Sequence, residues 1–582
     1  MARGEHDSYW SRAFRRRLSR RAFARGTATA AGLAAAALIG CSAPQRPVDR
    51  PAPPPPPTDE DELLRVVPVA SSTPTAVRRG GRLQHYSYTD APHLDPSLSI
   101  SAQTHHRASL VYGTLVELLQ GPKGIYDTVA SADLAEAWEA SDDRLTWTFR
   151  LRPGVKWANV PPMSGRPLVA EDVVFSFLRN MSAEGANAAR YAMLAGPPTA
   201  VDDRTVVFKL QYPHPGFFFN IATEPSEILP SDVVERDGGL KAWGAGTGPF
   251  IMTKYVPGEV ASYARNPDYY DANRVYLDGV DWRVVEQNGD AIARFRAGKL
   301  DVIGAPTGAH RLTPNVADDV VQSVPGAQRT DFLGPSHSAL ALKFGRPEFR
   351  DLRVRQAINF ALDRRAHIDD LAGGAGAITG TFPYSRFPAF ALPADEIARV
   401  VRFDLTEAKK LMAAAGMSEG FDVPLMWRPS QQADMQLHWK QLNAIGVRLD
   451  SSAEAVDYPT WVSRAYDGGY GAVAEWGYSV GSIWDYMAGV HSSKGDRNGP
   501  QTNDPRVDAM IDRLLRTLDP HDQVVQVRAI ERYLLTESLY VIPLIVAQGA
   551  MIQQPNVRDF VPGFGAKGGV HLSNHLRRAW FA

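Results

Sequence analysis

A short run near residue 480 contains the side-chain types of a serine nucleophile. Residues 477–481 read Gly-Tyr-Ser-Val-Gly, which fits the G-x-S-x-G nucleophile elbow of α/β-hydrolases. An acid, Asp485 or Asp508, and then His571 follow the serine in the chain order that these enzymes use. Because the pattern is short and the chain holds 48 glycines, it also arises by chance. We expect no catalytic residue and keep a serine hydrolase acting through Ser479 as an alternative.

The same run is rich in aromatic side chains that could hold a solute. Four of them fall within eleven residues: Trp476, Tyr478, Trp484 and Tyr486. Aromatic faces with polar edges suit sugars, amidated or cyclic peptides and planar natural products. Trp476, Tyr478 and Trp484 are therefore candidate binding residues, and core packing is the alternative for two of the four.

Metal and cofactor chemistry have little support in the sequence. Cys41 is the only cysteine, so the chain can form neither an internal disulfide nor a cysteine-based metal site. His105 and His106 are adjacent, and neighbouring residues do not share one face of a helix or strand. The chain has no Walker A or H-E-x-x-H pattern, and no G-x-G-x-x-G pattern follows a predicted strand. We expect no cofactor and no bound metal.

The first 41 residues have the features of an export leader. Arg20 and Arg21 lie in a stretch similar to the twin-arginine export motif, and the uncharged, alanine-rich residues 28–39 follow. That apolar run is too short to span a bilayer. Residues 38–41 read Leu-Ile-Gly-Cys, which matches a bacterial lipobox. The sequence predicts a lipoprotein signal over residues 1–41 with lipid attachment at Cys41.

Residues 42–79 are predicted to be a tether. They hold ten prolines and an acidic patch at residues 59–62, which favours a stiff, extended chain or a disordered linker over a domain. The whole chain has a formal net charge of −1, and its leader holds eight arginines against two acids. The part after the leader is therefore acidic, which disfavours binding to nucleic acid.

The remaining residues alternate strand and helix patterns. Apolar residues at every second position of 145–151 predict a half-buried strand after a turn. One helix is predicted with a buried stripe at i, i+3, i+4 and i+7: Val174, Phe177, Leu178 and Met181. Asp351 and Asp404 are predicted N-caps of two later helices, and Gly416 a C-terminal stop. Together with a composition of 44% hydrophobic and 22% charged residues, these patterns predict a folded α/β protein of two or three domains.

An ordered series of short motifs resembles the extracytoplasmic solute-binding proteins of the peptide and nickel type, called family 5. The resemblance runs from about Arg82 to the C-terminus. In the first half the motifs are Leu94-Asp95-Pro96, Val111-Tyr112-Gly113-Thr114-Leu115, Leu134-Ala135-Glu136-Ala137-Trp138, residues 145–157 and Ala170-Glu171-Asp172-Val173. Further on they are Gly246-Thr247-Gly248-Pro249-Phe250, residues 265–270 and residues 349–357.

The resemblance implies a two-lobed, Venus-flytrap architecture like that of periplasmic binding proteins, with an extra subdomain inserted in lobe I. Lobe I is expected from three stretches: residues 80–99, 198–305 and 545–582. The inserted subdomain is expected over residues 100–197, and lobe II over residues 306–544. Two hinged lobes that close over a solute suit reversible capture rather than chemistry.

The resemblance also places candidate ligand residues. Ser101, Ala102 and Gln103 match a loop that lines the cleft of relatives. Peptide-binding relatives carry a Trp-x-x-Asp element whose aspartate pairs with the ammonium group of the peptide, and Ser479 stands at that position here. A buried ammonium without its carboxylate loses roughly 3–5 kcal/mol, so free-amine peptides are poor candidates. Glu475 or Asp485 replacing the aspartate is left open.

The predicted function is capture of a small solute, oligopeptide-like or non-peptide, for an ABC importer. The expected partners are that solute and the permease and ATPase subunits, and the membrane is reached through the lipid anchor alone. The protein is expected to be a monomer on the outer side of the cytoplasmic membrane, in a periplasm or at the cell surface. A ligand-sensing lipoprotein that serves no transporter is a further alternative.

Overall fold

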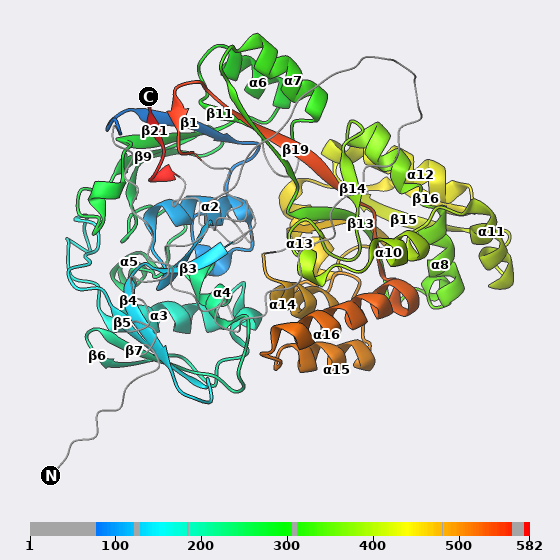
Figure 1. Cartoon of the computed structure of the whole chain (residues 1–582), viewed down its shortest axis with the longest axis horizontal. Coiled ribbons are helices and arrows are strands. Elements are labelled where there is room, and N and C mark those ends of the chain that lie inside the picture. The colour runs from blue at the N-terminus through cyan, green and yellow to red at the C-terminus, as the bar shows by residue number, and fades with distance from the viewer. Residues whose placement is uncertain (1–76, 121–127, 183–184, 305–310, 480, 561–575) are drawn as a thin grey trace, which may run out of the picture. The chain divides into compact units, whose positions relative to one another are not determined.

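The computed structural model describes residues 77–120, 128–182, 185–304, 311–479, 481–560 and 576–582. Strands and helices alternate through this part of the chain, so the predicted mixed α/β class is confirmed (Figure 1). The predicted leader and all but the last three residues of the predicted tether lie outside the described residues. The predicted lobe boundaries stay a prediction.

A four-stranded sheet joins the start of the described chain to residues near 280. Its order is β1 (Arg82–Ser87), β10 (Gly279–Val284), β9 (Val260–Arg265) and β8 (Phe250–Val256). Strands β1 and β10 are parallel, with Arg82 beside Gly279, whereas the other pairs are antiparallel. Leu83 and Trp282 of this sheet are 0% and 1% exposed, so the sheet packs on a core.

A second four-stranded sheet contains the strand predicted at 145–151. Its order is β4 (Ala135–Ala140), β5 (Thr146–Leu151), β7 (Thr205–Lys209) and β6 (Thr199–Asp202). The alternating residues Trp147, Phe149 and Leu151 are buried, which confirms the predicted strand. Phe149 meets Phe208 of β7 edge to face, with ring centroids 5.5 Å apart, and such pairs stabilise a core beyond their buried area. Nearby lie the pair β2 (Val116–Gln120) and β3 (Thr128–Ala132), and the short helices α4 (Phe217–Ala222) and α5 (Ser231–Asp237).

Helix α3 (Ala170–Met181) forms where a helix was predicted, but it buries a different face. Its buried residues include Val173, Ser176, Phe177 and Asn180, and Leu178 is 49% exposed. Two of these are polar yet have partners, because the Asn180 side chain donates to the Pro225 carbonyl and the Ser176 hydroxyl accepts from the Leu229 amide. The predicted stripe was therefore wrong by one position, since apolar spacing alone ignores polar side chains that find partners inside.

The largest sheet has helices on both faces. Its order is β16 (Val447–Ala455), β15 (Phe421–Trp427), β17 (Val473–Ser479), β13 (Ser336–Leu342) and β18 (Val541–Pro543). One cluster packs Leu340 and Leu342 of β13 against helices α8 (Leu352–Ala361), α11 (Leu405–Ala414) and α12 (Gln432–Asn443). The other packs Ala339 and Ala341 against α13 (Tyr458–Asp467), α14 (Ile483–Tyr486), α15 (Pro505–Leu514) and α16 (Pro520–Tyr533). Because strand side chains alternate, these clusters occupy opposite faces of the sheet.

Two predicted caps are confirmed on the first of these helix layers. The Asp351 carboxylate accepts the Arg353 amide at 2.9 Å, where α8 begins. Asp404 accepts the Glu407 amide at 2.9 Å, where α11 begins. Gly416 follows the end of α11 with φ +74°, a left-handed conformation that glycine adopts at little cost.

Strand β19 (Ile545–Gln553) belongs to two clusters at once. It pairs with β11 (Val302–Ile303), β12 (Gln328–Leu333) and β14 (Gly376–Ile378), as Figure 1 shows. Its last residues, Ala550 and Ile552, share a core with α6 (Asn288–Arg296) and α7 (Pro314–Ser323), whereas its first residue, Ile545, packs on Ile368. The strand directly follows β18 of the five-stranded sheet. Strand β19 therefore connects the large sheet to the elements around residue 300, and β12, which leads into β13 of the large sheet, forms a second connection.

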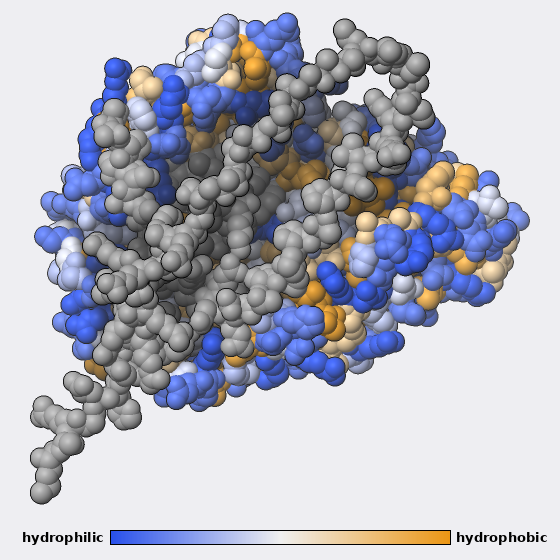
Figure 2. Space-filling model, in the orientation of Figure 1, coloured by the Kyte–Doolittle hydropathy of each residue, from blue (hydrophilic) through white to orange (hydrophobic). Residues whose placement is uncertain are grey.

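The remaining named elements are short. They include α9 (Arg364–Ala366), α10 (Ala394–Val400), and the pair β20 (Val557–Arg558) and β21 (Trp580–Phe581). On the face seen in Figure 2, hydrophilic residues dominate outside the grey atoms. Exposed large apolar residues are scattered along the described chain: Leu178, Val201, Ile378, Phe403, Trp439 and Val525. None of the described helices has the length and apolar character needed to cross a bilayer.

Candidate functional site

The predicted loop at residues 101–103 is the start of a helix. Ser101 is the N-cap of α2 (Ala102–Val111), and its hydroxyl accepts the Gln103 amide at 3.3 Å. The Gln103 side chain is buried and accepts from Arg107 one turn later. The neighbouring Ile100 packs against the hydrophobic cluster of the five-stranded sheet that contains Trp476. Ile100 thus places the start of α2 against that cluster, and the ligand-binding role of Ser101, Ala102 and Gln103 stays a prediction.

A row of aromatic side chains continues from Trp476. Ring centroids of Trp476 and Tyr466 lie 5.8 Å apart, those of Tyr466 and Trp461 5.8 Å, and those of Trp461 and Tyr458 6.3 Å. Tyr88, which follows β1, meets Tyr458 edge to face at 5.8 Å. We call these five residues the aromatic row. It joins a segment next to the β1 sheet to helix α13 and strand β17.

Arg428 lies on this row directly after strand β15. Its guanidinium carbon is 4.2 Å from the ring centroid of Trp461 and 5.8 Å from that of Tyr458. Its Nε donates to the Gln431 side chain at 2.5 Å, and its two terminal nitrogens bond to no described residue. The two terminal nitrogens of a guanidinium are donors that can match the two oxygens of a carboxylate.

Two indole groups add further unused donors. Trp476 is 3% exposed, and its Nε1 finds no hydrogen-bond partner among the described residues. The same holds for the buried Nε1 of Trp484, whose ring packs on the Trp476 cluster. A buried donor without a partner is costly, so water or a solute is expected to accept from it.

The structure gives different surroundings to the other residues predicted between 476 and 486. Tyr486 is 1% exposed in the core, and its hydroxyl donates to the Thr381 carbonyl, so it serves packing. The Trp484 ring lies against Gly216 of the segment that precedes α4. Tyr478 and Ser479 pair through their backbones with His337 and Ser336 of β13, whereas their side chains lie outside the described part. Their binding roles therefore stay predictions.

Neither acid considered as a substitute for the missing aspartate is a free carboxylate. Asp485 forms an ion pair with Arg497 at 2.9 Å, and both side chains are less than a tenth exposed. Glu475 is 2% exposed, and burial raises the pKa of its carboxyl well above the usual range. Asp485 is thus already paired with Arg497, and burial favours the protonated form of Glu475.

The hydrolase alternative gains no support from this geometry. Ser479 is the last residue of β17, inside the strand ladder, whereas an elbow puts the serine on the turn that follows the strand. Asp485 is engaged by Arg497, and Asp508 accepts hydrogen bonds from Ser492 and from the Ser493 amide. His571 lies outside the described residues.

The adjacent histidines point to different surroundings. His105 is buried, its Nε2 donates to the Ser99 carbonyl at 2.9 Å, and its Nδ1 lies 3.7 Å from Glu227. His106 stacks on Trp282 with ring centroids 6.0 Å apart. Across the ranges that the structure describes, no three histidine, cysteine or acidic residues gather as a metal site would require.

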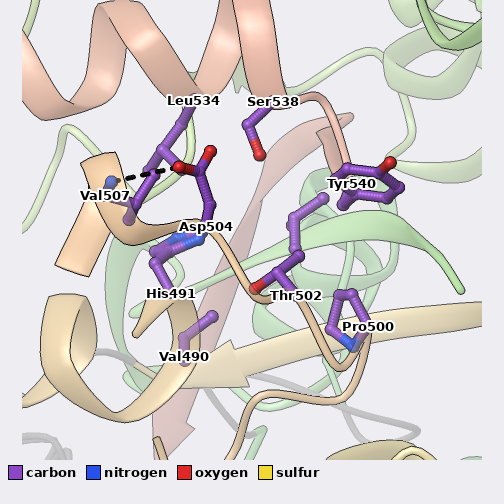
Figure 3. A pocket seen from close by; sticks show the side chains of 10 residues that line it. Val490, His491, Pro500, Thr502, Asp504, Val507, Leu534, Ser538 and Tyr540 are labelled. Atoms are coloured by element: carbon purple, nitrogen blue, oxygen red, sulfur yellow. Dashed lines mark hydrogen bonds between the residues drawn. The ribbon is translucent and has the colours of Figure 1, made fainter. Parts of the chain in front are cut away.

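A small pocket lies elsewhere, between α15 and the end of α16. His491, Asp504 and Ser538 are among its lining residues, and Figure 3 shows their side chains around it. Its interior volume is about 10 Å³, which suits a single water. None of the predicted binding residues lines it. The pocket is too small to hold a solute.

Five members of this site were not predicted from the sequence: Tyr88, Arg428, Tyr458, Trp461 and Tyr466. Arg428 had a local pattern that could have revealed it. Arg428 and Pro429 directly follow a buried strand, and ligand-binding groups lie at the carboxyl ends of strands in α/β sheets. Tyr88 had none, because its partner Tyr458 is 370 positions away along the chain.

Solved structures show the class of protein to which this fold belongs. The structure is similar to DppA of Helicobacter pylori in complex with the peptide STSA, with a TM-score of 0.74, 21% identity and coverage of 87% of this chain and 98% of that one. It is equally similar to AgaA of A. tumefaciens R10 in complex with agropinic acid, with a TM-score of 0.74, 21% identity and coverage of 86% and 99%. Both are periplasmic binding proteins, so the two-lobed fold implied by the resemblance is confirmed.

Sequence comparisons give the family. Residues 130–498 match the model of the bacterial extracellular solute-binding proteins, family 5. Heme-binding protein A of Haemophilus influenzae is 25% identical over 498 residues, covering 80% of this chain and 87% of that protein. The dipeptide-binding protein of Escherichia coli is 26% identical over 435 residues, covering 70% and 77%. The chain belongs to the family 5 extracytoplasmic solute-binding proteins, and the relatives found are binding proteins rather than enzymes.

Proposed function

We propose that this protein captures a small acidic solute without a free ammonium group and delivers it to an ABC importer. The single observation that carries the proposal is the charge pattern of the aromatic row. Arg428 offers two unused donors, Asp485 is already paired with Arg497, and burial raises the pKa of the two nearby acids, Glu475 and Asp434, which favours their uncharged forms. A solute rich in acceptors fits such a surface better than an amine does.

Two indole donors support the same solute class. Trp476 and Trp484 each have a buried N–H without a partner in the described part, and both can donate to a carbonyl or carboxylate. The aromatic faces of Tyr458 and Trp461 offer contact area for the rest of the solute. Ser479 takes the position of the ammonium-binding aspartate of peptide-binding relatives, so nothing in this surface replaces that charge.

The ligands named for similar proteins include compounds of this kind. They comprise heme for one relative, and agropinic and mannopinic acid for two solved structures, beside several peptides. A fold that accepts such different solutes leaves the choice to the side chains of each site.

Calorimetric titration with matched peptides tests the proposal. Acetyl-trialanine keeps a carboxylate and lacks the ammonium group, whereas trialanine has both. We expect acetyl-trialanine to bind at least about tenfold more tightly, since an unpaired buried ammonium is strongly unfavourable. Arg428→Met should abolish that binding. Tighter binding of trialanine, or an unchanged Arg428→Met variant, would contradict the proposal.

We also propose the attachment and partners that the sequence predicts. Cys41 would carry the lipid, Arg20 and Arg21 would direct export, and a monomer would dock on permease and ATPase subunits. The lipobox at residues 38–41 and the proline-rich residues 42–79 support this arrangement. Cys41→Ser should move the protein from the membrane fraction to the soluble fraction of the producing cell, and its retention on the membrane would refute lipid attachment.

A further inference from the structure

His214 lies between β7 and α4, and a backbone hydrogen bond determines which nitrogen of its ring carries the proton. The Gly216 amide donates to Nδ1 of His214 at 3.0 Å. Because Nδ1 accepts, the proton of the neutral imidazole is on Nε2. That nitrogen bonds to no described residue, and His214 is partly exposed. The segment therefore presents a donor that the protein does not use.

The His214 ring is uncharged near neutral pH. Burial lowers the pKa of its imidazole to about 4, and the negative charge of Asp485 opposes that shift. Asp485 itself is paired with Arg497 at 2.9 Å. His214 therefore offers a hydrogen bond, rather than a charge, to a neighbouring group.

Trp484 lies beside His214, although it comes from a distant part of the chain. A Cβ placed on Gly216 would lie 3.0 Å from Cε1 of His214, the atom bonded to Nε2, and 3.3 Å from Cε3 of Trp484. Both rings therefore border the same backbone position. The Trp484 ring also packs on the cluster that contains Trp476, and its buried Nε1 has no partner in the described part. His214 is thus a neighbour of the candidate site.

A second contact holds the His214 segment against the region that contains α14 and α15. The rings of His214 and Tyr212 have centroids 5.8 Å apart, and the Arg516 guanidinium lies 4.0 Å from the Tyr212 centroid. Arg516 follows the end of α15. Solute sites occur preferentially where separate parts of a fold meet, and His214 lies at such a place.

We propose that His214 is a further solute-binding residue, whose Nε2–H donates to an uncharged carbonyl of the solute next to Trp484. This inference rests on the proposed function, in which Arg428 binds the acid group. An uncharged donor suits an uncharged acceptor, because a carboxylate buried without a cation is strongly unfavourable. The solute class is thereby narrowed to acids that also carry an amide or similar carbonyl group, as N-acylated amino acids do.

Two substitutions separate solute binding from a purely structural role of His214. His214→Gln keeps a donor near the position of Nε2 and loses the acceptor for the Gly216 amide. His214→Asn does the reverse, because its side-chain oxygen can replace Nδ1 but no atom reaches the position of Nε2. If His214 only held the Gly216 amide, the asparagine variant would be the better replacement.

Calorimetric titration of acetyl-trialanine, which carries amide carbonyls and a carboxylate, gives the measurement. We expect His214→Gln to bind within about twofold of the unaltered protein and His214→Asn about three- to tenfold more weakly, the effect of one lost hydrogen bond. His521→Asn changes an exposed histidine of α16 and should leave the affinity unchanged. Thermal unfolding followed by circular dichroism checks that the three variants are folded.

The outcomes separate this inference from the proposed function. Unchanged affinity in His214→Asn, or a loss in His214→Gln as large as that in His214→Asn, would refute the role of His214 and leave the proposed function standing. No binding of acetyl-trialanine by the unaltered protein would refute both.

The imidazole nitrogen signals in nuclear magnetic resonance provide an independent readout. We expect the Nε2–H tautomer of His214 in the free protein, because the Gly216 amide occupies Nδ1. Addition of acetyl-trialanine should shift the Nε2 signal, since that nitrogen would then donate to the solute. An Nδ1–H tautomer, or an Nε2 signal that saturating acetyl-trialanine leaves in place, would overturn the inference.

Discussion

At the scale of single residues, the site depends on which acids are already paired. Asp485 lies six positions after the serine that replaces the expected aspartate, yet it bonds to Arg497 inside the protein. Glu475 lies four positions before that serine, and burial raises the pKa of its carboxyl well above the usual range. Arg428 therefore supplies the positive charge of the aromatic row, which is why the proposed solute is an acid.

The Asp485–Arg497 pair should be important for stability. Asp485→Asn should lower the free energy of unfolding by about 3 kcal/mol, because the buried Arg497 would lose its 2.9 Å ion pair with the Asp485 carboxylate. Chemical denaturation measures the difference. Asp422→Asn is the control, since Asp422 and Arg448 are 73% and 45% exposed and such pairs contribute less than about 1 kcal/mol. Equal effects of the two changes would show that the buried pair has no special role.

At the scale of elements, the helices after Asp351 and Asp404 begin where the sequence predicts, but the start of another helix and the buried face of a third depend on neighbours. The start of α2 shows this, because a predicted cleft loop is capped by Ser101 and becomes helical. Helix α3 shows it again, because Ser176 and Asn180 take buried positions by bonding to the segment before α5. Polar side chains with partners can thus displace an apolar stripe by one position.

The buried face of α3 can be tested with two neighbouring residues. Phe177→Ala should cost about 3–5 kcal/mol of unfolding free energy, because Phe177 is 0% exposed and packs on Phe208 at 4.9 Å. Leu178→Ala should change it by less than about 0.5 kcal/mol, because Leu178 is 49% exposed. Both values come from the same denaturation experiment. Similar losses in the two variants would favour the stripe that the apolar spacing predicted.

At the scale of the whole folded part, we expect contacts between distant segments to affect solute capture. The segment at residues 212–216 touches the end of α15 and α14: the Arg516 guanidinium is 4.0 Å from the Tyr212 ring centroid, and Trp484 lies against Gly216. Tyr88 meets Tyr458 in the same way. In a family whose lobes close over a solute, such contacts favour the closed form and slow the release of the solute.

The contribution of the Arg516 contact can be measured through the rate at which the solute dissociates. An exposed cation–π pair contributes about 0.5–1 kcal/mol, so Arg516→Ala should release acetyl-trialanine about two- to fivefold faster in stopped-flow dissociation. Arg513→Ala removes an exposed arginine from the same helix and should leave the rate unchanged. An unchanged rate in Arg516→Ala would mean that the contact does not hold the closed form.

The sequence by itself determined whatever depends on neighbours in the chain. The strand at β5, the caps Asp351 and Asp404, and the family follow from short patterns, because hydrogen bonds and side-chain periodicity over a few residues produce them. It also drew attention to Trp476 and to the missing aspartate at Ser479.

Only the tertiary structure decided which groups are available to a solute. Arg428 and Tyr88 come from segments far apart in the chain, and the pairing of Asp485 with Arg497 removes a carboxylate that the sequence left open. Burial and partners set the charge of Glu475, and neither can be read from its neighbours in the chain. The reason is physical: the free energy of a charge depends on the solvent and the opposite charges around it, and folding alone brings these together.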